Sequence, residues 1–503
     1  MSSTALSSDA RIGVLGGGAM GAGIAQVALS AGHPVVLLEV SEARTSAAHA
    51  AVTAGLHAAS ERGKLPRDAA TGMAHALQLT TDIGALRECA LVIEAVAEDL
   101  AIKQSLFADL ERVVPGDCLL ATNTSSLSVE SIAASLSSPE RLVGMHFFNP
   151  APVMPLVEIV SGLGSSPEVV TALEQTAQGW GKQTIRCRST PGFVVNRIAR
   201  PFYSEALALL ETTTITASDI DALFREAGGF RMGPLQVTDL IGQDVNAAVT
   251  ESVWRALNLD PRYRPSALQR RMVDAGRLGR KSGHGFYDRT SPSEVPPPPT
   301  PVTREQRELT VEVGPAAPLA PLVQRLDLTV LASDDLDRWI RLPSGALLGL
   351  TDGRPATEHA HEQSCDVVLL DLVLDWSRAS RVGATSNESC STALRDEINE
   401  LLAPLDVTWL PDEPGLVIAR TVALLVDEAV ALSSSQAIAP AELDRAVTLA
   451  LGYPLGPLSW GQQVGASYVV TLLDAMERLQ PGGRFRACGA LRRAALSGRV
   501  LDG

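Results

Sequence analysis

Residues 11–21, RIGVLGGGAMG, decide the fold of the amino-terminal part of the chain. A short apolar run leads into Gly16, and an alanine-rich, helix-prone stretch follows from Ala22 to Ser30. Gly32 ends that stretch, and a second apolar run, PVVLLE, occupies residues 34–39. Strand, glycine turn, helix and strand in this order predict a βαβ unit of a parallel sheet.

The glycine turn has the G-x-G-x-x-G spacing of a dinucleotide-binding site, with its glycines at Gly16, Gly18 and Gly21. Gly16 allows the tight turn, Gly18 lets the backbone approach a pyrophosphate, and Gly21 permits close packing of helix on strand. The amino terminus of the next helix offers free N–H groups to the phosphates. The predicted cofactor contacts in this turn are Gly16, Gly18, Ala19, Met20 and Gly21.

Glu39 ends the second predicted strand, 18 residues after Gly21. Its carboxylate can accept hydrogen bonds from the ribose of an adenosine and would repel a 2′-phosphate. NAD is therefore favoured over NADP as the cofactor. The alternative interpretation is a tight turn beside a surface glutamate.

Further apolar runs alternate with helix-like segments and extend the predicted sheet; they occupy residues 91–96, 118–122 and 142–148. This repetition predicts a Rossmann-type, doubly wound α/β domain over residues 11–188. Strand-like runs stop after Pro191-Gly192, so residues 189–288 are predicted to form an all-α domain.

The all-α domain occurs twice in the sequence. With a shift of 223 residues, PGFVVNR at 191–197 aligns with PGLVIAR at 414–420, and Gly-Pro-Leu at 233–235 aligns with the same tripeptide at 456–458. The second copy is expected over residues 411–503.

The segment between the two copies begins with a proline-rich linker, expected over residues 289–320. Residues 321–410 again alternate apolar strand-like and helical runs, but they have no glycine-rich nucleotide turn. They are therefore predicted to form a degenerate α/β-like segment. Residues 1–10 are polar and serine-rich and are expected to form a disordered tail.

Composition excludes several classes of function. The 503-residue chain has 57 acidic and 42 basic residues, so a nucleic-acid partner is not expected. It has no run of about 18 apolar residues and no signal peptide, so no membrane partner is expected either, and the predicted location is cytoplasmic. The six cysteines show no C-x-x-C and no metal-ligand spacing with histidines, which predicts a reduced compartment and no metal.

One histidine, His146, lies at the carboxyl end of a predicted strand, where open α/β sheets bind ligands. Twelve residues later, Glu158 lies within the apolar run LVEIV, where a carboxylate must be paired or hydrogen-bonded. Oxidation of a secondary alcohol needs a base for the hydroxyl proton, and a neutral imidazole oriented by a carboxylate suits that task. The two residues are predicted to form a catalytic pair; the alternative is a core histidine beside a structural ion pair.

Five features of the sequence point to one family: the glycine turn with Met20, NTSS at 123–126, HFFNP at 146–150, Glu158, and PGFVVNR at 191–197. Together they resemble the NAD-dependent 3-hydroxyacyl-CoA dehydrogenases. The match covers about residues 11–288 and keeps the order and spacing of that family. It implies reversible oxidation of an (S)-3-hydroxyacyl-CoA to the 3-oxoacyl-CoA, with the acyl-CoA in a cleft between the α/β domain and the first helical domain.

The resemblance also implies roles for single residues. His146 would be the general base and Glu158 its orienting partner, while Ser125 and Asn196 would hydrogen-bond the reacting oxygens. The NTSS segment could instead be only a strand end with a helix cap, and Asn196 could cap a turn. Lys64 lies where the family binds CoA. The cofactor contacts implied by the family are Glu98, Lys103, Ser125, Asn149 (near the nicotinamide) and Lys281.

The second helical copy resembles the longer bacterial family members that act on 3-hydroxyadipyl-CoA in phenylacetate breakdown, and 3-hydroxybutyryl-CoA dehydrogenases of similar length. The first substrate is favoured; 3-hydroxybutyryl-CoA, general fatty-acid β-oxidation, a free hydroxy acid and a non-enzymatic NAD-binding role are the alternatives. The second copy has Ala419 where the first has Asn196. Because the family usually dimerises through one helical domain per chain, we expect an inactive second half that forms an internal pseudo-dimer; a homodimer is a further expectation.

Overall fold

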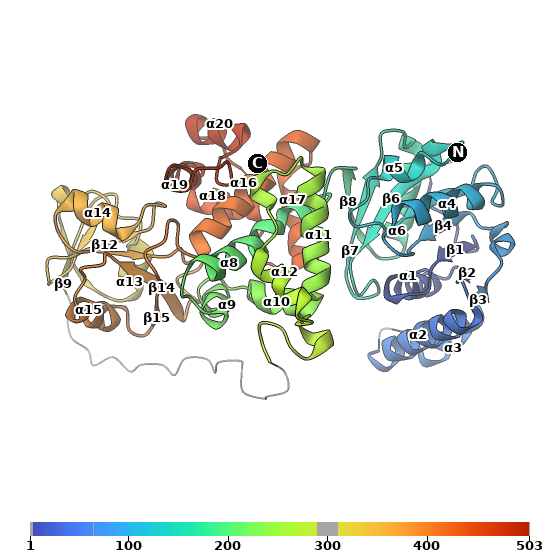
Figure 1. Ribbon diagram of the computed structural model, residues 1–503, viewed down its shortest axis with the longest axis horizontal. Coiled ribbons are helices and arrows are strands. Elements are labelled where there is room, and N and C mark those ends of the chain that lie inside the picture. Colours follow the sequence, from blue (N-terminus) through green and yellow to red (C-terminus); the bar gives the residue numbers. More distant parts are fainter. Residues whose placement is uncertain (1–3, 64, 289–309, 502–503) are drawn as a thin grey trace. The chain divides into compact units, whose positions relative to one another are not determined.

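The computed structural model describes residues 4–63, 65–288 and 310–501 (Figure 1). The described residues form two compact units. The first contains the chain up to Arg197 together with Gln436–Leu451, and the second contains Ile198–Ser435 together with the chain from Gly452 onward. A short piece of the second helical copy thus belongs to the unit that carries the glycine turn.

The first unit is built on an eight-stranded sheet with the order β3-β2-β1-β4-β5-β6-β7-β8. All neighbouring strands are parallel except β6 and β7, which are antiparallel. This architecture is the Rossmann-type sheet that the sequence predicts. The strands are β1 Ile12–Leu15, β2 Val35–Leu38, β3 Leu77–Thr80, β4 Leu91–Glu94, β5 Leu119–Thr122, β6 Leu142–Phe147, β7 Leu156–Ser161 and β8 Gln183–Arg188.

Helices pack against this sheet and complete its core (Figure 1). Several of them begin at a side-chain cap, provided by Ser41, Asp99, Ser128 and Ser166. The helices are α1 Ala19–Ser30, α2 Glu42–Glu61, α3 Arg67–His75, α4 Leu100–Glu111, α5 Val129–Ala133, α6 Pro167–Gly179 and α17 Pro440–Leu451, followed at the boundary of the units by α7 Val195–Ile198.

The amino-terminal residues differ from the expected disordered tail over the part that the structure describes. The Ala5 N–H donates to Gln175 Oε1 at 3.0 Å, and the Leu6 N–H donates to Thr176 Oγ1 at 3.2 Å. The Leu6 side chain also packs against the core of the first unit. One apolar residue and two acceptors on α6 therefore hold this segment, which a polar composition alone does not reveal.

The second unit contains a seven-stranded sheet with the order β10-β9-β11-β12-β13-β14-β15. It begins at Thr310, inside the range expected to be linker, because β9 pairs with both β10 and β11. The rest of that linker, residues 289–309, lies outside the described residues. The strands are β9 Thr310–Val313, β10 Thr329–Ala332, β11 Ile340–Arg341, β12 Leu347–Leu350, β13 Val367–Leu370, β14 Arg381–Ser386 and β15 Asp406–Trp409.

The other helices belong to the second unit. None of the helices within the described ranges is long and apolar enough to cross a membrane. The first helical copy has α8 Arg200–Thr212, α9 Ala217–Glu226, α10 Pro234–Ile241, α11 Gln243–Ala256 and α12 Ala267–Asp274; the second sheet has α13 Ala320–Arg325, α14 Ala356–Gln363 and α15 Thr392–Leu402; the second copy has α16 Ile418–Gln436, α18 Pro457–Val464, α19 Ala466–Leu479 and α20 Gly489–Ser497.

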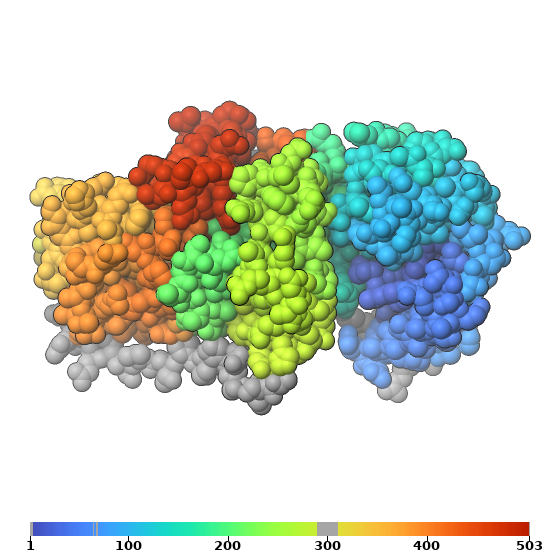
Figure 2. All heavy atoms as spheres, viewed as in Figure 1, coloured from blue at the N-terminus to red at the C-terminus, as the bar shows by residue number. Residues whose placement is uncertain are grey.

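The two helical copies, green and red in Figure 2, lie against each other. A reciprocal pair of buried glutamates joins them. Glu205 of α8 accepts hydrogen bonds from Arg420 at 3.0 Å and Arg484 at 2.6 Å. Glu428 of α16 accepts from Arg262 at 2.5 Å and from the Tyr263 hydroxyl at 2.5 Å. Since the 223-residue shift aligns Glu205 with Glu428, each copy holds the equivalent glutamate of the other, as in an isologous dimer interface.

We expect Glu205→Ala to destabilise the second unit by about 3–5 kcal/mol, because it leaves a buried guanidinium without its carboxylate. Glu205 is fully buried, and although burial alone would raise its pKa, Arg484 and Arg420 bring that pKa below its ordinary value. Urea unfolding would measure the change. Glu88→Ala removes the exposed ion pair with Arg11 and should cost less than about 1 kcal/mol. Equal small losses in both variants would contradict the expectation.

Candidate active site

The glycine turn has the open backbone that a dinucleotide needs. Gly16 has a φ of +92°, and a Cβ atom on Gly21 would lie 1.8 Å from the Gly16 carbonyl oxygen. A Cβ on Gly18 would meet no heavy atom of the described chain within 4 Å, so the space before it is open. Gly18 also begins α1 without a side-chain cap, which leaves the first N–H groups of the helix to a ligand. The turn therefore fits the pyrophosphate of NAD.

Glu39 lies beside this turn in an ionised state. It accepts hydrogen bonds from the Gly17 N–H at 2.7 Å, the Val40 N–H at 3.0 Å and Arg44 Nε at 2.8 Å. Burial alone would raise the pKa of Glu39, but these three donors outweigh it and lower the pKa. The carboxylate is thus fixed in place as an acceptor.

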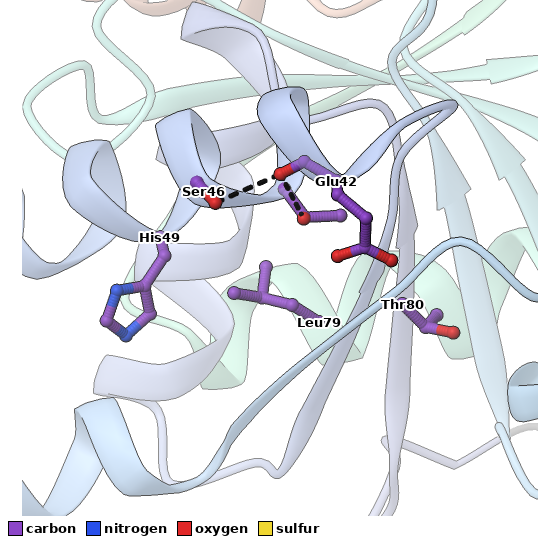
Figure 3. A pocket seen from close by; sticks show the side chains of 6 residues that line it. Glu42, Ser46, His49, Leu79 and Thr80 are labelled. Carbon is purple, nitrogen blue, oxygen red and sulfur yellow. Dashed lines mark hydrogen bonds between the residues drawn. The ribbon is translucent and has the colours of Figure 1, made fainter.

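A pocket of about 430 Å³ lies between α2 and β3 (Figure 3). It is close to Glu39, because the Glu39 N–H donates to the carbonyl of Thr80, one of the lining residues, at 3.0 Å. Its wall combines the first turns of α2 with the edge strand β3. Polar side chains of α2 line one side of it, which suits a polar ligand group. The lining residues are Glu42, Thr45, Ser46, His49, Leu79 and Thr80.

His146 and Glu158 lie directly opposite each other on β6 and β7. Nδ1 of the imidazole is 2.6 Å from Oε2 of the carboxylate, and both side chains are buried. The second carboxylate oxygen, Oε1, accepts the N–H groups of Val194 at 3.0 Å and Val195 at 2.9 Å. Because Glu158 occupies Nδ1, Nε2 is the ring nitrogen that remains to exchange a proton with a ligand.

Glu98 and Lys103 shape the loop that follows β5. Lys103 is 1 % exposed, and its ammonium lies 2.6 Å from Glu94 and 3.2 Å from Glu98. Glu98 Oε1 accepts the Thr124 hydroxyl at 2.6 Å and the Ser125 N–H at 2.9 Å. Burial alone would raise the pKa of Glu98, but Lys103 and these donors lower it. Lys103 thus contacts Glu98, and Glu98 in turn binds the loop that contains Ser125.

Glu94 is a site residue that the sequence interpretation missed. It is fully buried at the end of β4 and also accepts the Thr122 hydroxyl at 2.7 Å. The signal was present, because Glu94 interrupts the apolar run LVIEAV just as Glu158 interrupts LVEIV. A carboxylate in such a run needs partners, and here the partner is the buried lysine.

The other predicted site residues have different positions. Asn149 follows β6 and precedes a cis proline, and Asn196 lies in α7, directly after the two N–H groups that bind Glu158. Asn123 links the loop of Ser125 to β6, because its Oδ1 accepts the Phe147 N–H at 2.8 Å. Lys281 belongs to the second unit, where it pairs with Asp244 at 2.5 Å. Lys64 lies outside the described residues.

In the second half, Asp371 binds the start of the helix equivalent to α7, as Glu158 does in the first half. The residue opposite Asp371 on the neighbouring strand is a glycine, whereas the residue opposite Glu158 is His146. Asp371, which follows β13, accepts the N–H groups of Val417, Ile418 and Ala419 at 2.8–3.1 Å. The 223-residue shift aligns these residues with those that follow Phe193. The Asp371 N–H donates to the carbonyl of Gly383 on the antiparallel strand β14. Burial raises the pKa of Asp371 to about 6.

This fold and site define a dinucleotide-dependent oxidoreductase, and comparison with known proteins identifies its family. The model of the 3-hydroxyacyl-CoA dehydrogenase NAD-binding domain matches residues 11–190, and that of the family's C-terminal domain matches residues 192–289 and again 415–501. Residues 348–414 match the reduced Rossmann-fold domain of 3-hydroxybutyryl-CoA dehydrogenase. The chain belongs to the 3-hydroxyacyl-CoA dehydrogenase family, whose members are NAD-dependent oxidoreductases. The predicted fold class, cofactor and reaction class are thereby confirmed.

Three relatives illustrate the similarity. A 3-hydroxyadipyl-CoA dehydrogenase of Escherichia coli is 41 % identical over 96 % of this chain and 97 % of its own. A 3-hydroxybutyryl-CoA dehydrogenase of Mycobacterium tuberculosis is 41 % identical over 55 % of this chain and 97 % of its own. The crystal structure of a 3-hydroxybutyryl-CoA dehydrogenase from E. coli superimposes with a TM-score of 0.87 at 38 % identity, covering 97 % of this chain and 99 % of that one.

We expect Glu39→Ser to weaken NADH binding by about tenfold and to strengthen NADPH binding, because it removes the ribose acceptor and frees Arg44 for a 2′-phosphate. Fluorescence titration of both dinucleotides would measure the two dissociation constants. Glu61→Ser removes an exposed carboxylate at the other end of α2, away from the pocket, and serves as the control. Unchanged discrimination between NADH and NADPH in Glu39→Ser would contradict the role assigned to Glu39.

Proposed function

We propose that this dehydrogenase oxidises 3-hydroxyadipyl-CoA in phenylacetate catabolism. The proposal is supported by the E. coli relative of that name, which aligns along 96 % of this chain, both helical copies included. 3-Hydroxybutyryl-CoA is the second candidate, supported by the two similar 3-hydroxybutyryl-CoA dehydrogenases, the E. coli enzyme with the superimposable crystal structure and the M. tuberculosis relative.

The chemistry follows from the His146–Glu158 contact, the observation that carries the mechanism. Nε2 of His146 takes the proton of the C3 hydroxyl, while Glu158 fixes the tautomer and stabilises the imidazolium that forms. Bound NAD⁺ supplies the acceptor for the hydride that leaves C3. In this proposal Ser125 and Asn196 would hydrogen-bond the reacting oxygens, and Asn149 would contact the nicotinamide when NAD is bound. In the reverse direction His146 returns the proton to the oxygen.

Other residues hold the ligands in this proposal. Glu98 and Lys103 fix the loop of Ser125, which would contact the cofactor; the 3.2 Å contact between the buried Lys103 and Glu98 supports this role. Lys281 and Lys64 act as local positive charges for the cofactor and the CoA phosphates, against the net charge of −15. A cytoplasmic location is supported by the six cysteines, all of which are free thiols.

His146→Gln should lower kcat by about 10²- to 10⁴-fold while NADH binding stays unchanged, because the variant loses the base but keeps the nucleotide turn. Acetoacetyl-CoA-dependent oxidation of NADH would measure turnover, and fluorescence titration would measure binding. His361→Gln, a change at a histidine of the second half that lies far from the catalytic pair in sequence, is the control. Full turnover in His146→Gln would refute the assignment of the base.

Turnover of a panel of thioesters would decide the substrate. We expect kcat/KM for 3-hydroxyadipyl-CoA to exceed that for 3-hydroxybutyryl-CoA by at least about tenfold, since a site built for a terminal carboxylate leaves polar groups unpaired with the shorter chain. The free 3-hydroxy acid should react poorly, because it lacks the CoA contacts. A preference for the butyryl thioester would select the second candidate instead.

We further propose that the second helical copy takes the place of a dimer partner. The reciprocal contacts of Glu205 and Glu428 between the two copies support this role. A variant that lacks residues 304–503 should expose the apolar face of α8 and then aggregate or dimerise, which light scattering would detect. A remnant with full activity and an unchanged oligomeric state would count against the proposal.

A further inference from the structure

One helix of the second copy packs against the first sheet. Helix α17 belongs to the first unit and contacts β7 and β8 (Figure 1). Just before it, the side-chain amide of Gln436 bonds to the end of β8 at two points. Its Oε1 accepts the Arg188 N–H at 2.8 Å, and its Nε2 donates to the Thr190 hydroxyl at 3.0 Å.

The equivalent contact exists in the other direction within the second unit. Helix α9, which the 223-residue shift aligns with α17, packs against β14 of the second sheet. There the carbonyl of Glu226 accepts the Ser380 N–H at 3.0 Å, and its carboxylate accepts Arg381 Nε at 3.0 Å. Each helical copy therefore covers the sheet of the opposite half, which indicates a repeated structural feature rather than an incidental contact.

Thr190 begins the turn that leads to the catalytic pair. Its carbonyl accepts the Phe193 N–H at 2.8 Å, and Phe193 adopts a φ of +49°, a left-handed conformation that a bulky residue rarely takes. The Phe193 ring lies 5.7 Å from the imidazole of His146, centroid to centroid. The next two N–H groups bind Glu158, so this one turn touches both members of the pair.

From these contacts we infer that Gln436, in the second half of the chain, is a positioning residue for the catalytic base. Its two hydrogen bonds hold the Arg188 backbone and the Thr190 hydroxyl. Thr190 in turn holds the left-handed conformation of Phe193, which would otherwise relax. Relaxation would move the Phe193 ring away from His146 and the two N–H groups away from Glu158. The inference rests on the proposed roles of His146 and Glu158, and it gives the second half a direct part in the geometry of the active site.

Gln436→Ala in the full-length protein should lower kcat about three- to tenfold and leave the dissociation constant of NADH unchanged, because the glycine turn does not contact this residue. Gln436→Glu should retain most of the turnover, since its carboxylate can accept both the Arg188 N–H and the Thr190 hydroxyl. Thr190→Val should repeat the loss from the other side of the contact. Gln363→Ala removes an exposed glutamine of the second half and is the matched control.

The decisive measurement repeats Gln436→Ala in a Glu158→Gln background, where the further loss in kcat should vanish if the effect passes through Glu158. Full turnover in Gln436→Ala, or an equal loss in both backgrounds, would overturn this inference and leave the proposed function intact. Full turnover in Glu158→Gln itself would overturn the proposed function and this inference with it.

Discussion

The arrangement of the active site depends on the need to satisfy one buried carboxylate. Glu158 is fully enclosed between β6, β7 and the turn that precedes α7, where an unpaired charge would be very costly. Three donors meet this need, namely the imidazole of His146 and two backbone N–H groups. The same interaction therefore joins the sheet to the start of the helical region and orients the histidine.

In the second half, a buried carboxylate also binds the backbone N–H groups at the start of a helix, but no histidine lies opposite it. Asp371 receives three N–H groups at the equivalent helix, although a glycine replaces any partner on the opposite strand. The carboxylate comes from the first strand of the antiparallel pair, whereas Glu158 comes from the second. A buried carboxylate thus binds the N–H groups at the start of this helix in both halves, and in the first half a histidine pairs with it.

Local patterns predict the first sheet and the His146–Glu158 contact, because the glycine turn and the LVEIV run carry their information within a few residues. They fail where the deciding contact is distant. Glu94 gives the same signal as Glu158, but its meaning depends on Lys103 in another element. Strand β9 follows a proline-rich stretch, so its own sequence does not mark it as a strand; its pairing with β10 and β11 does. The sequence repeat predicts two helical copies, but it does not predict that α17 of the second copy packs on β7 and β8 of the first sheet.

The joining of both copies in one polypeptide has a consequence for assembly. Two separate chains must meet, so the fraction assembled falls on dilution, whereas copies on one chain meet at an effective concentration set by the connecting segment. The contacts between the two copies therefore form at any protein concentration. They include the ion pairs of Glu205 and Glu428 and the hydrogen bond of Gln436 to the end of β8. If the active site depends on these contacts, as proposed, activity per molecule does not change with the concentration of the enzyme.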